Sequence, residues 1–215
     1  MSKAEPTPRK RGRPLGGTEG QRRHEMLMAA SNLFIEQGFG DTSMEAVTKR
    51  AGISKKTIYG FVTTKEKLFE AVMQDHMAHA DLPELPDRVA DAKALELALA
   101  TYLNRLAAAI LNCTAVGLFR LTVAEASRFP GVAQSFFREG ALRHINQVAG
   151  WLEAQAKAGL ISLTDPVLAA RILTSFIILD PLRAAAMGLQ ELPSPADMDV
   201  RVRMVTGIFV NGCAK

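Results

Sequence analysis

The sequence predicts an all-α protein. Apolar residues recur at helical spacing along most of the 215 residues, and proline and glycine separate the segments that carry them. No segment alternates between apolar and polar residues as a half-buried strand does, and no internal repeat is present. Because 48% of the residues are hydrophobic, the chain can bury a sizeable core, in one body or in two closely packed domains. We expect roughly nine helices.

Two short helices around a tight turn are predicted between residues 42 and 68. Thr42 or Ser43 is suited to cap the first helix by accepting from the free N–H groups of its first turn. Gly52 ends this helix, since glycine tolerates the left-handed conformation that a close turn needs. Ser54 caps the second helix. The exposed side of that helix carries Lys55, Lys56, Thr57 and Tyr59.

This second helix has the character of one that reads DNA. It places cations and hydrogen-bond donors on one side and the apolar anchors Ile53 and Ile58 on the other, which suits the DNA major groove. The segment is therefore predicted to be a helix-turn-helix. The alternative is an ordinary pair of packed helices joined by Ala51-Gly52, as short αα-hairpins often show. The cationic second helix favours DNA binding.

Several short motifs follow one another in this region. They are Ala-Ala-Ser-Asn-Leu-Phe at 29–34, Glu-Gln-Gly-Phe at 36–39, Ala-Gly-Ile-Ser at 51–54, Thr-Ile-Tyr at 57–59 and Lys-Glu-Lys-Leu at 65–68. In this order they resemble the DNA-binding domain of TetR-type transcriptional regulators, over about residues 22–73. The resemblance implies that double-stranded operator DNA is the partner of this domain.

The resemblance also implies roles for individual residues. Thr42 or Ser43, together with Lys65, would hold phosphates on either side of the groove. Tyr59 would reach the DNA backbone. The residues nearest the base edges would be Lys55, Lys56, Thr57 and Gly60.

Three positions depart from the family pattern. Gly60 stands where a side chain is usual, so it offers no base contact and weakens the recognition helix by up to ~1 kcal/mol. Phe61 stands where histidine, tyrosine or asparagine is common, and Val62 where phenylalanine is common. A phenyl group donates no hydrogen bond, so Phe61 is not expected to bind a phosphate.

The positive charge of the chain is concentrated at the DNA-facing end. Residues 1–23 hold seven Lys and Arg against two Glu, a net of +5, whereas residues 76–215 hold 13 residues of each sign. Residues 1–20 are rich in Pro and Gly and poor in apolar residues, so we expect a disordered basic arm.

Within this arm, Arg11-Gly12-Arg13-Pro14 resembles the core of an AT-hook. Arg11 and Arg13 would then lie in a narrow A·T-rich minor groove. The alternative is an unspecific basic arm. Either form adds salt-sensitive affinity for DNA.

Six further helices are predicted after the helix-turn-helix. Asp165-Pro166 is a start signal, Gly159 ends the helix before it, and Pro181 should kink or interrupt the helix that contains it. The expected helices cover residues 66–80, from Asp87 or Asp91 to about 111, 115–127, 131–158, 166–187 and 196–210.

The chain is expected to divide into a basic arm (1–20), a DNA-binding domain (21–67) and a ligand-binding and dimerisation domain (68–215). The sequence from Arg120 to Pro130 resembles the helix-six segment of AefR-like members of the family. That resemblance implies a homodimer formed through the last two helices and a cavity for a small molecule.

The apolar pattern is compatible with such a dimer. Residues 167–179 are apolar nearly all round, so the chain's own core and a partner should both cover them. The last helix would supply the other half of the interface through Val202, Val205, Ile208 and Phe209.

Candidate ligand-binding residues are mostly aromatic. Those we select are Tyr102, Leu106, Phe119, Val123, Trp151 and Phe176, with Phe136, Phe137 and Arg183 as further candidates. For each aromatic residue the alternative is plain core packing. For Arg183 the alternative to binding an anionic ligand is an ion pair with Asp180.

Other classes of function have little support in the sequence. His76 and His79 have a spacing that could hold a metal, but no third strong ligand is near them, so no metal or other cofactor is expected. Signatures of an enzyme and of a membrane span are lacking, and no signal peptide is recognisable. Cys113 and Cys213 are expected to be free thiols. We therefore expect a cytoplasmic protein without membrane contact.

The sequence thus favours a homodimeric, ligand-responsive DNA-binding repressor. A small molecule of unknown identity would bind the C-terminal cavity and release the protein from its operator. One alternative is a constitutive or architectural DNA-binding regulator without an inducer. Another is a small-molecule enzyme that keeps a vestigial helix-turn-helix.

Overall fold

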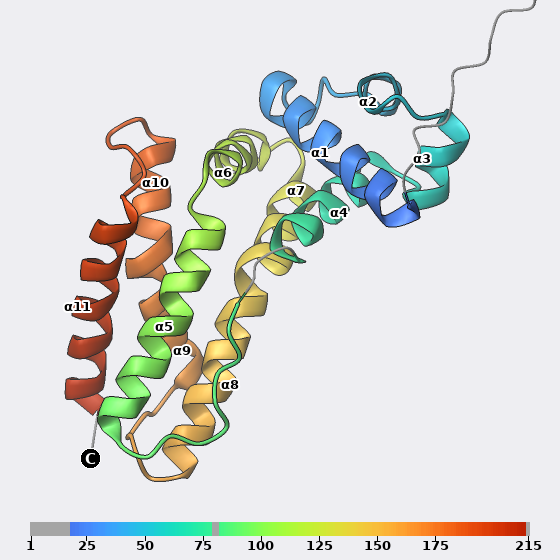
Figure 1. Ribbon diagram of the computed structural model, residues 1–215. Helices are drawn as coiled ribbons and strands as arrows, with labels where there is room; N and C mark the ends of the chain where they lie inside the picture. Colours follow the sequence, from blue (N-terminus) through green and yellow to red (C-terminus); the bar gives the residue numbers. More distant parts are fainter. Residues whose placement is uncertain (1–17, 79–81, 214–215) are drawn as a thin grey trace, which may run out of the picture.

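Four helices form the N-terminal part of the computed structural model, which describes residues 18–78 and 82–213. These helices are α1 (Glu19–Gln37), α2 (Met44–Ala51), α3 (Lys55–Phe61) and α4 (Lys65–Ala78). Among the described residues no segment is a β-strand, which confirms the all-α prediction. Figure 1 shows α1, α2 and α3 together at one end of the molecule and α4 leading away from them.

The predicted capping residues set the ends of these short helices. Ser43 Oγ accepts from Ala46 N at 3.0 Å at the start of α2, and Ser54 Oγ accepts from Thr57 N at 3.1 Å at the start of α3. Gly52, with φ 65°, ends α2 in the left-handed conformation.

Aromatic rings hold the N-terminal helices together. Phe34, Phe39 and Phe69 are buried, and their ring centroids lie 5.5–5.9 Å apart. Phe129, which follows α6 in the C-terminal part of the chain, places its ring 5.0 Å from that of Phe39. The aromatic core of the N-terminal helices is therefore extended by a residue from the C-terminal part of the chain.

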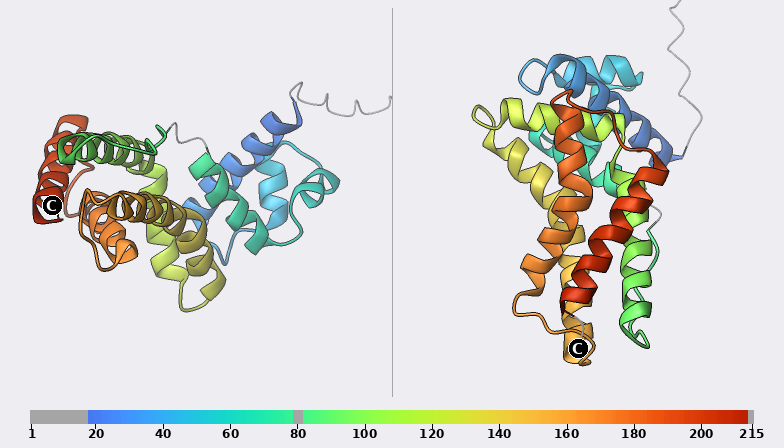
Figure 2. Two further views of the ribbon diagram at one scale, coloured as in Figure 1. Left: turned by 90° about the horizontal axis from the view of Figure 1, so that it is seen from below. Right: turned by 90° about the vertical axis from the view of Figure 1, so that its left-hand side faces the viewer.

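The C-terminal part is a bundle of longer helices. α5, α8, the α9–α10 rod and α11 run side by side, and α6 lies between this bundle and the N-terminal helices (Figures 1 and 2). Leucine side chains from several of these helices form its core, among them Leu99, Leu152 and Leu173. The segments are α5 (Ala92–Ile110), α6 (Cys113–Glu125), α7 (Pro130–Ser135), η1 (Phe136–Leu142), α8 (Arg143–Lys157), α9 (Pro166–Thr174), η2 (Ser175–Leu179), α10 (Asp180–Ala186) and α11 (Pro195–Cys213).

Two long helices contain a π-helical segment that the periodicity did not predict. The expected helix at 131–158 consists of α7, η1 and α8 in direct succession, and the expected helix at 166–187 consists of α9, η2 and α10. Counted as continuous rods, the described residues form nine helices, as predicted. Pro181 lies in the first turn of α10, directly after the widened turns of η2. Its ring nitrogen has no hydrogen to donate, so the regular α-helical hydrogen bonding is interrupted at this point.

Candidate DNA-binding surface and effector cavity

The exposed side of α3 carries most of the predicted DNA-reading residues. Lys55, Lys56 and Tyr59 are exposed, and the Tyr59 side chain reaches 52% exposure. Thr57 is half-buried, and its hydroxyl lies 2.9 Å from Ser54 Oγ. A Cβ atom added at Gly60 would meet nothing within 4 Å, so this position is an open part of the same surface.

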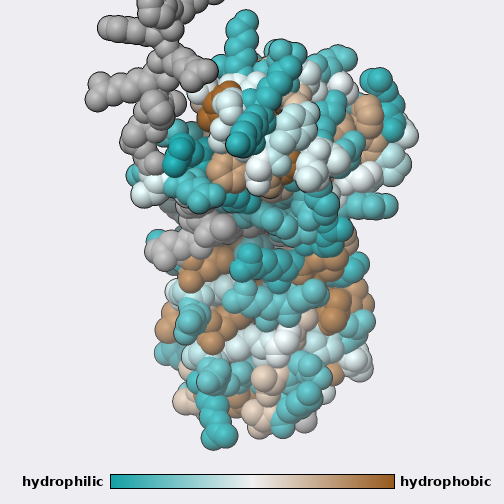
Figure 3. Space-filling view, turned by 90° about the vertical axis from the view of Figure 1, so that its right-hand side faces the viewer, coloured by the Kyte–Doolittle hydropathy of each residue, from teal (hydrophilic) through white to brown (hydrophobic). Residues whose placement is uncertain are grey.

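The hydrophobic residues of α3 anchor it to the domain. Ile58 is completely buried, Val62 is 8% exposed, and Phe61 is partly buried against the same core. Phe61 therefore serves packing, in line with its lack of a polar group. Figure 3 shows that the end of the molecule with the helix-turn-helix is covered mainly by hydrophilic residues in that view.

Thr42 does not belong to this surface, which corrects one sequence prediction. Its side chain is buried, and its hydroxyl donates to the carbonyl oxygens of Gly38 (2.7 Å) and Leu33 (3.2 Å). A hydroxyl with its one hydrogen shared between these carbonyls is not available to a phosphate. Ser43, its neighbour, is exposed and is the residue that caps α2.

Lys65 is also engaged inside the molecule. Its ammonium group donates to the carbonyl oxygens of Phe39 (2.6 Å) and Gly40 (2.8 Å) and lies 4.7 Å from the centre of the Phe39 ring. The predicted phosphate contact must therefore share this ammonium with two backbone carbonyls. In the free protein Lys65 ties the first turn of α4 to the turn between α1 and α2.

The predicted arginines of the arm, Arg11 and Arg13, lie outside the described residues. The described chain begins at Thr18, which forms a capping box with Gln21 at the start of α1. Helix α1 thus begins at Glu19, close to the expected end of the arm.

A cavity of about 330 Å³ lies in the C-terminal domain, next to its junction with the DNA-binding end. Helices α4, α5, α6, α8, α9 and α10 contribute to its wall, and both π-helical segments do so as well. Most lining side chains are apolar. They are Met73, Leu106, Ile110, Ala115, Leu118, Phe119, Phe136, Phe137, Ala141, Ile145, Ile178, Leu179 and Leu182, accompanied by Gly140 and by the polar residues His76, His144, Arg171, Thr174 and Ser175.

The cavity has few polar groups, and its two histidines are mostly neutral near pH 7. Burial and, to a smaller extent, the positive charge of Arg143 together lower the pKa of His144 to about 4. Burial also lowers the pKa of His76, although the charge of Asp75 opposes this shift. Arg171 is exposed and lies at the edge of the cavity, where its guanidinium is 5.9 Å from the centre of the Phe137 ring.

Two of the six selected ligand-binding residues line this cavity. Leu106 and Phe119 are in its wall, and so are the further candidates Phe136 and Phe137. Sequence reasoning did not place the two histidines in a cavity wall, because it weighed His76 only as a metal ligand and did not consider His144. The only signal in the sequence was their polarity on otherwise apolar helix faces.

The other candidates lie elsewhere, which corrects their placement. Tyr102 is buried in the bundle core, where its hydroxyl donates to Gln147. Trp151 is also buried and donates its indole N–H to Pro86 O at 2.8 Å. Val123 and Phe176 are exposed by 64% and 59%, because they lie on outward-facing sides of α6 and η2.

Arg183 is likewise not part of the wall. Its guanidinium donates to Asp180 at 2.9 Å, and both side chains are exposed. This is the ion pair that the sequence left open as the alternative.

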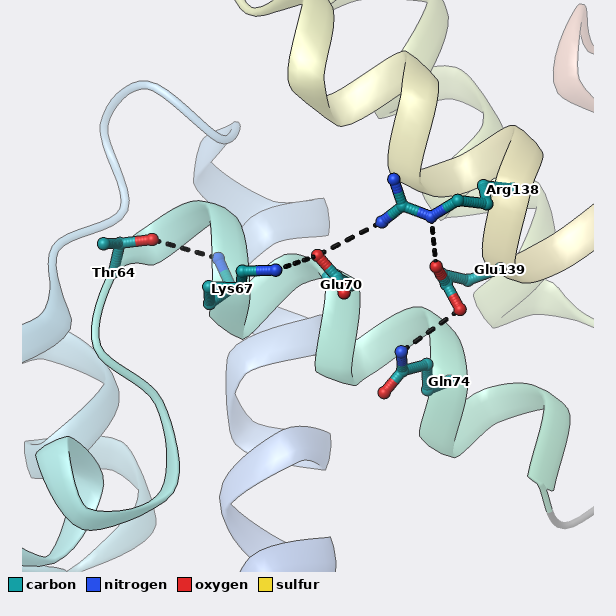
Figure 4. Close-up of polar contacts among 6 residues, drawn as sticks. All are labelled: Thr64, Lys67, Glu70, Gln74, Arg138 and Glu139. Atoms are coloured by element: carbon teal, nitrogen blue, oxygen red, sulfur yellow. Dashed lines mark hydrogen bonds and ion pairs between the residues drawn. The ribbon is translucent and has the colours of Figure 1, made fainter.

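Charged side chains link the cavity wall to α4 (Figure 4). Arg138 of η1 lies 3.2 Å from Glu70 of α4, and Glu139 accepts from Gln74 of α4 at 3.1 Å. Lys67 extends the network by contacting Glu70 at 2.9 Å. The phenyl rings of η1 therefore line the cavity, whereas the charged residues of η1 contact α4.

A second link joins α6 to the turn between α1 and α2. Glu125, the last residue of α6, accepts from the backbone N–H of Gly40 at 3.3 Å. At the same turn, Lys65 bonds the carbonyl oxygen of Gly40. The DNA-binding domain is thus held at one turn by both α4 and α6.

An apolar surface lies on the outward faces of α9, η2 and α11. Figure 2 shows these helices side by side on one face of the molecule. Their exposed large apolar residues are Val167, Leu168, Ile172, Phe176, Leu179, Val200, Met204 and Ile208. Of the four residues expected to supply the α11 half of a dimer interface, only Ile208 faces outward. Val202 is completely buried, and Val205 and Phe209 are partly buried against the chain's own core.

The described residues offer little support for other sites. No group of three or more His, Cys, Asp or Glu among them is placed to hold a metal ion. Within the same residues no single helix is long and apolar enough to cross a membrane, and α5 and α6 satisfy that test only as a pair bent by 74°. Cys113 and Cys213 are free thiols, as expected.

A helix-turn-helix with a cationic second helix, joined to a further helical domain, defines the class of DNA-binding regulators. Comparison with known families gives the particular group. Residues 26–72 match the family described as bacterial regulatory proteins, tetR family. Residues 97–212 match the C-terminal domain of AefR-like transcriptional repressors. The chain belongs to the TetR family and is a DNA-binding transcriptional regulator.

Individual relatives agree with this assignment. The HTH-type transcriptional activator FasR of Mycolicibacterium smegmatis is 35% identical over 86 residues, which cover 36% of this chain and 39% of FasR. The HTH-type transcriptional regulator YhgD of Bacillus subtilis is 24% identical over 193 residues, which cover 89% of this chain and 96% of YhgD.

Solved structures extend the similarity to the whole fold. The flavonoid-responsive regulator FrrA is 28% identical, has a TM-score of 0.72, and covers 91% of this chain and 98% of its own. A TetR-family regulator from Mesorhizobium loti is 24% identical with a TM-score of 0.71, and covers 93% of this chain and 100% of its own. This second likeness concerns the fold alone.

Proposed function

We propose that this regulator is a homodimeric repressor that a small molecule releases from its operator. The observation that carries the proposal is the position of α4. The first residue of this helix, Lys65, is bonded to the α1–α2 turn of the DNA-binding domain. Further along the same helix, Met73 and His76 line the cavity. A molecule in the cavity therefore touches the helix that holds the reading head.

The coupling follows from binding preferences. If ligand and operator bind best to different arrangements of α4, each lowers the affinity of the other by the same factor. The network of Arg138 and Glu70 and the contact of Glu125 with Gly40 supply two further routes by which a change in the cavity wall reaches the DNA-binding domain. Both routes end on α4 or on the turn that it holds.

The dimer would place two recognition helices on one pseudo-palindromic operator. An isologous interface made by the outward faces of α9, η2 and α11 would cover their apolar residues, and the family's mode of DNA binding as a dimer supports it. Each α3 would then enter a major groove with Lys55, Lys56 and Thr57 nearest the bases and Ser43 at a phosphate. A protein that acts on the cell's own DNA in this way would work in the cytoplasm.

The cavity favours a ligand-responsive regulator over the alternatives. A constitutive or architectural regulator has no need of a preformed apolar space, and about 330 Å³ lies at the lower end of the range of small-molecule sites. The similar protein FrrA is described as flavonoid-responsive, which supports response to a small molecule. We expect no catalysis, because the polar groups of the wall lack a nucleophile paired with a base.

Two measurements test the proposal. Selection of bound fragments from genomic DNA should recover a pseudo-palindromic sequence that the protein prefers to random DNA. A reporter gene behind that sequence should be expressed more strongly when the regulator's gene is deleted. Lower expression on deletion would show an activator instead, and equal affinity for selected and random DNA would indicate an architectural protein.

A further inference from the structure

Like His76, His144 places an imidazole with a buried, unpartnered Nε2 atom in the cavity wall. The residue lies on α8, is 5% exposed and lines the cavity. Its Nε2 atom is buried and has no hydrogen-bond partner among the described residues. An unpaired buried polar atom costs free energy, so a group supplied by a bound molecule would be stabilised at this nitrogen.

The neighbouring side chains decide whether Nε2 donates or accepts. The Tyr102 hydroxyl donates to Gln147 Oε1 at 3.0 Å, and the same hydroxyl lies 3.4 Å from Nδ1 of His144. Because the phenol has a single hydrogen, and that hydrogen points to Gln147, its oxygen accepts from His144. The hydrogen of the imidazole therefore sits on Nδ1.

Both rings keep these protonation states near neutral pH. Burial raises the pKa of Tyr102 to about 12, so the phenol retains its hydrogen. The pKa of His144, at about 4, leaves the imidazole with only one hydrogen. With that hydrogen on Nδ1, Nε2 is a bare, buried acceptor on a residue of the cavity wall.

The remainder of the wall restricts the overall charge of a ligand. Among the lining residues of the described chain there is no carboxylate to pair with a cation, and the one permanently charged side chain, Arg171, is exposed at the edge. The phenyl rings of Phe119, Phe136 and Phe137 offer apolar, aromatic contacts inside.

We infer that the cavity takes uncharged, largely apolar ring compounds and selects those with a hydroxyl group that donates to Nε2 of His144. The inference rests on the proposed function, because it names the class of molecule that the effector cavity binds. It assigns His144 as the specificity-determining residue and Tyr102 as a positioning residue that fixes the tautomer.

Three matched probes test this selection by isothermal titration calorimetry on the full-length protein. They are 2-naphthol, 2-methoxynaphthalene, which has the oxygen without its hydrogen, and naphthalene. The wild type should bind 2-naphthol about tenfold more tightly than either other probe, as expected for one buried hydrogen bond. His144→Leu should bind all three with similar affinity, because the acceptor is gone.

Tyr102→Phe keeps the ring and removes the hydroxyl that fixes the imidazole hydrogen. Nε2 can then carry the hydrogen, so the preference for 2-naphthol over 2-methoxynaphthalene should shrink severalfold while naphthalene binds as before. A purely structural role for Tyr102 would weaken all three probes together and would contradict its assignment. Lys157→Ala, which changes an exposed residue of α8 outside the cavity wall, is the control and should keep the wild-type preference.

The outcomes separate this inference from the proposed function. Equal binding of the three probes to the wild type, or a hydroxyl preference that survives in His144→Leu, would overturn the inference and leave a ligand-responsive regulator standing. Failure of the wild type to bind any of the three would also overturn the inference, whereas the operator selection and the reporter gene decide the proposed function independently.

Discussion

The guanidinium of Arg138 lies 3.2 Å from the carboxylate of Glu70, and this contact joins a π-helical wall of the cavity to α4 (Figure 4). Arg138 also donates to Glu139, its neighbour in the chain, at 2.5 Å. The hydrogen bond from Arg138 is the largest of the influences that hold the pKa of Glu139 below its ordinary value of 4.5. One arginine therefore stabilises two carboxylates on two sides of the junction.

Arg138→Gln should lower stability modestly and in a pH-dependent way. A carboxyl group whose pKa is lowered in the folded state stabilises the fold above its unfolded pKa, and this contribution is lost as the pH falls through the folded pKa. Because Arg138 is half exposed, solvent screens its charge and we expect only a small loss of stability at pH 7. Urea unfolding should show that the difference between variant and wild type shrinks as the pH falls below 4.5, the ordinary pKa of this carboxyl group. A difference that persists there would show that packing of the arginine stem, not charge, is responsible.

Thr42→Val should destabilise the protein without affecting DNA contacts. The change removes the buried hydroxyl that bonds Leu33 and Gly38, at a cost of about 1–2 kcal/mol. Chemical denaturation measures this loss. Ser43→Ala is the matched control, because it also removes a hydroxyl and costs about 1 kcal/mol as a lost helix cap. At a temperature where both variants are folded, only Ser43→Ala should bind operator DNA more weakly.

Lys55→Ala and Thr57→Ala should reduce affinity for the operator more than affinity for random DNA. If their side chains reach base edges, the difference should be about 1–3 kcal/mol for each. Competition binding at fixed salt measures both affinities. Lys157→Ala, which removes an exposed lysine of α8, should change neither. Equal losses on the two kinds of DNA would place Lys55 or Thr57 at phosphates only.

The proposed dimer can be separated from core stability by comparing neighbouring positions. Ile208 is 70% exposed, so Ile208→Asp should yield a folded monomer in sedimentation velocity. The adjacent Phe209 packs against the core, and Ile177 is completely buried, so Phe209→Asp and Ile177→Asp should unfold or aggregate instead. A wild type that sediments as a monomer at micromolar concentration would contradict the interface.

Removal of residues 1–17 should leave folding and dimerisation intact, because the cap of α1 begins at Thr18. Affinity for DNA should fall and its salt dependence should flatten, since fewer counterions are released. If Arg11 and Arg13 enter a minor groove, the loss should be larger for operators with A·T-rich flanks than for those with G·C-rich flanks. Equal losses would support an unspecific basic arm, and unchanged binding at all salt concentrations would remove the arm from the mechanism.

The sequence predicted the local signals of the fold well. Ser43, Gly52 and Asp165 act at helix ends where short-range chemistry decides the conformation, and each does what its residue type suggests. The residues that line the cavity were harder to predict. Whether an apolar side chain of a helix lines a cavity, packs against another helix or faces solvent depends on how the helices pack, which the local sequence does not specify. Phe119 lines the space whereas Phe176 faces outward, yet both are phenylalanines on apolar helices.

The two π-helical segments were not predictable from periodicity for a related reason. A single widened turn shifts the register of a helix by one residue, and a pattern of closely spaced apolar residues such as 175–179 tolerates either register. Thr42 and Lys65 illustrate a further limit. Family resemblance suggested partners for their polar groups in DNA, whereas tertiary contacts supply partners within the chain.

The widened turns of η1 also bear on how such a cavity changes over evolutionary time. Each π turn accommodates one residue more than an α turn. Deleting a single residue between 136 and 142 would restore α-helical winding and rotate the preceding part of the rod by about 100° relative to α8. Phe136 and Phe137 would leave the wall together, in one mutational step. If the cavity binds an effector as proposed, insertions and deletions inside a helix are a route to new specificity, alongside the side-chain replacements by which binding sites are usually assumed to diversify.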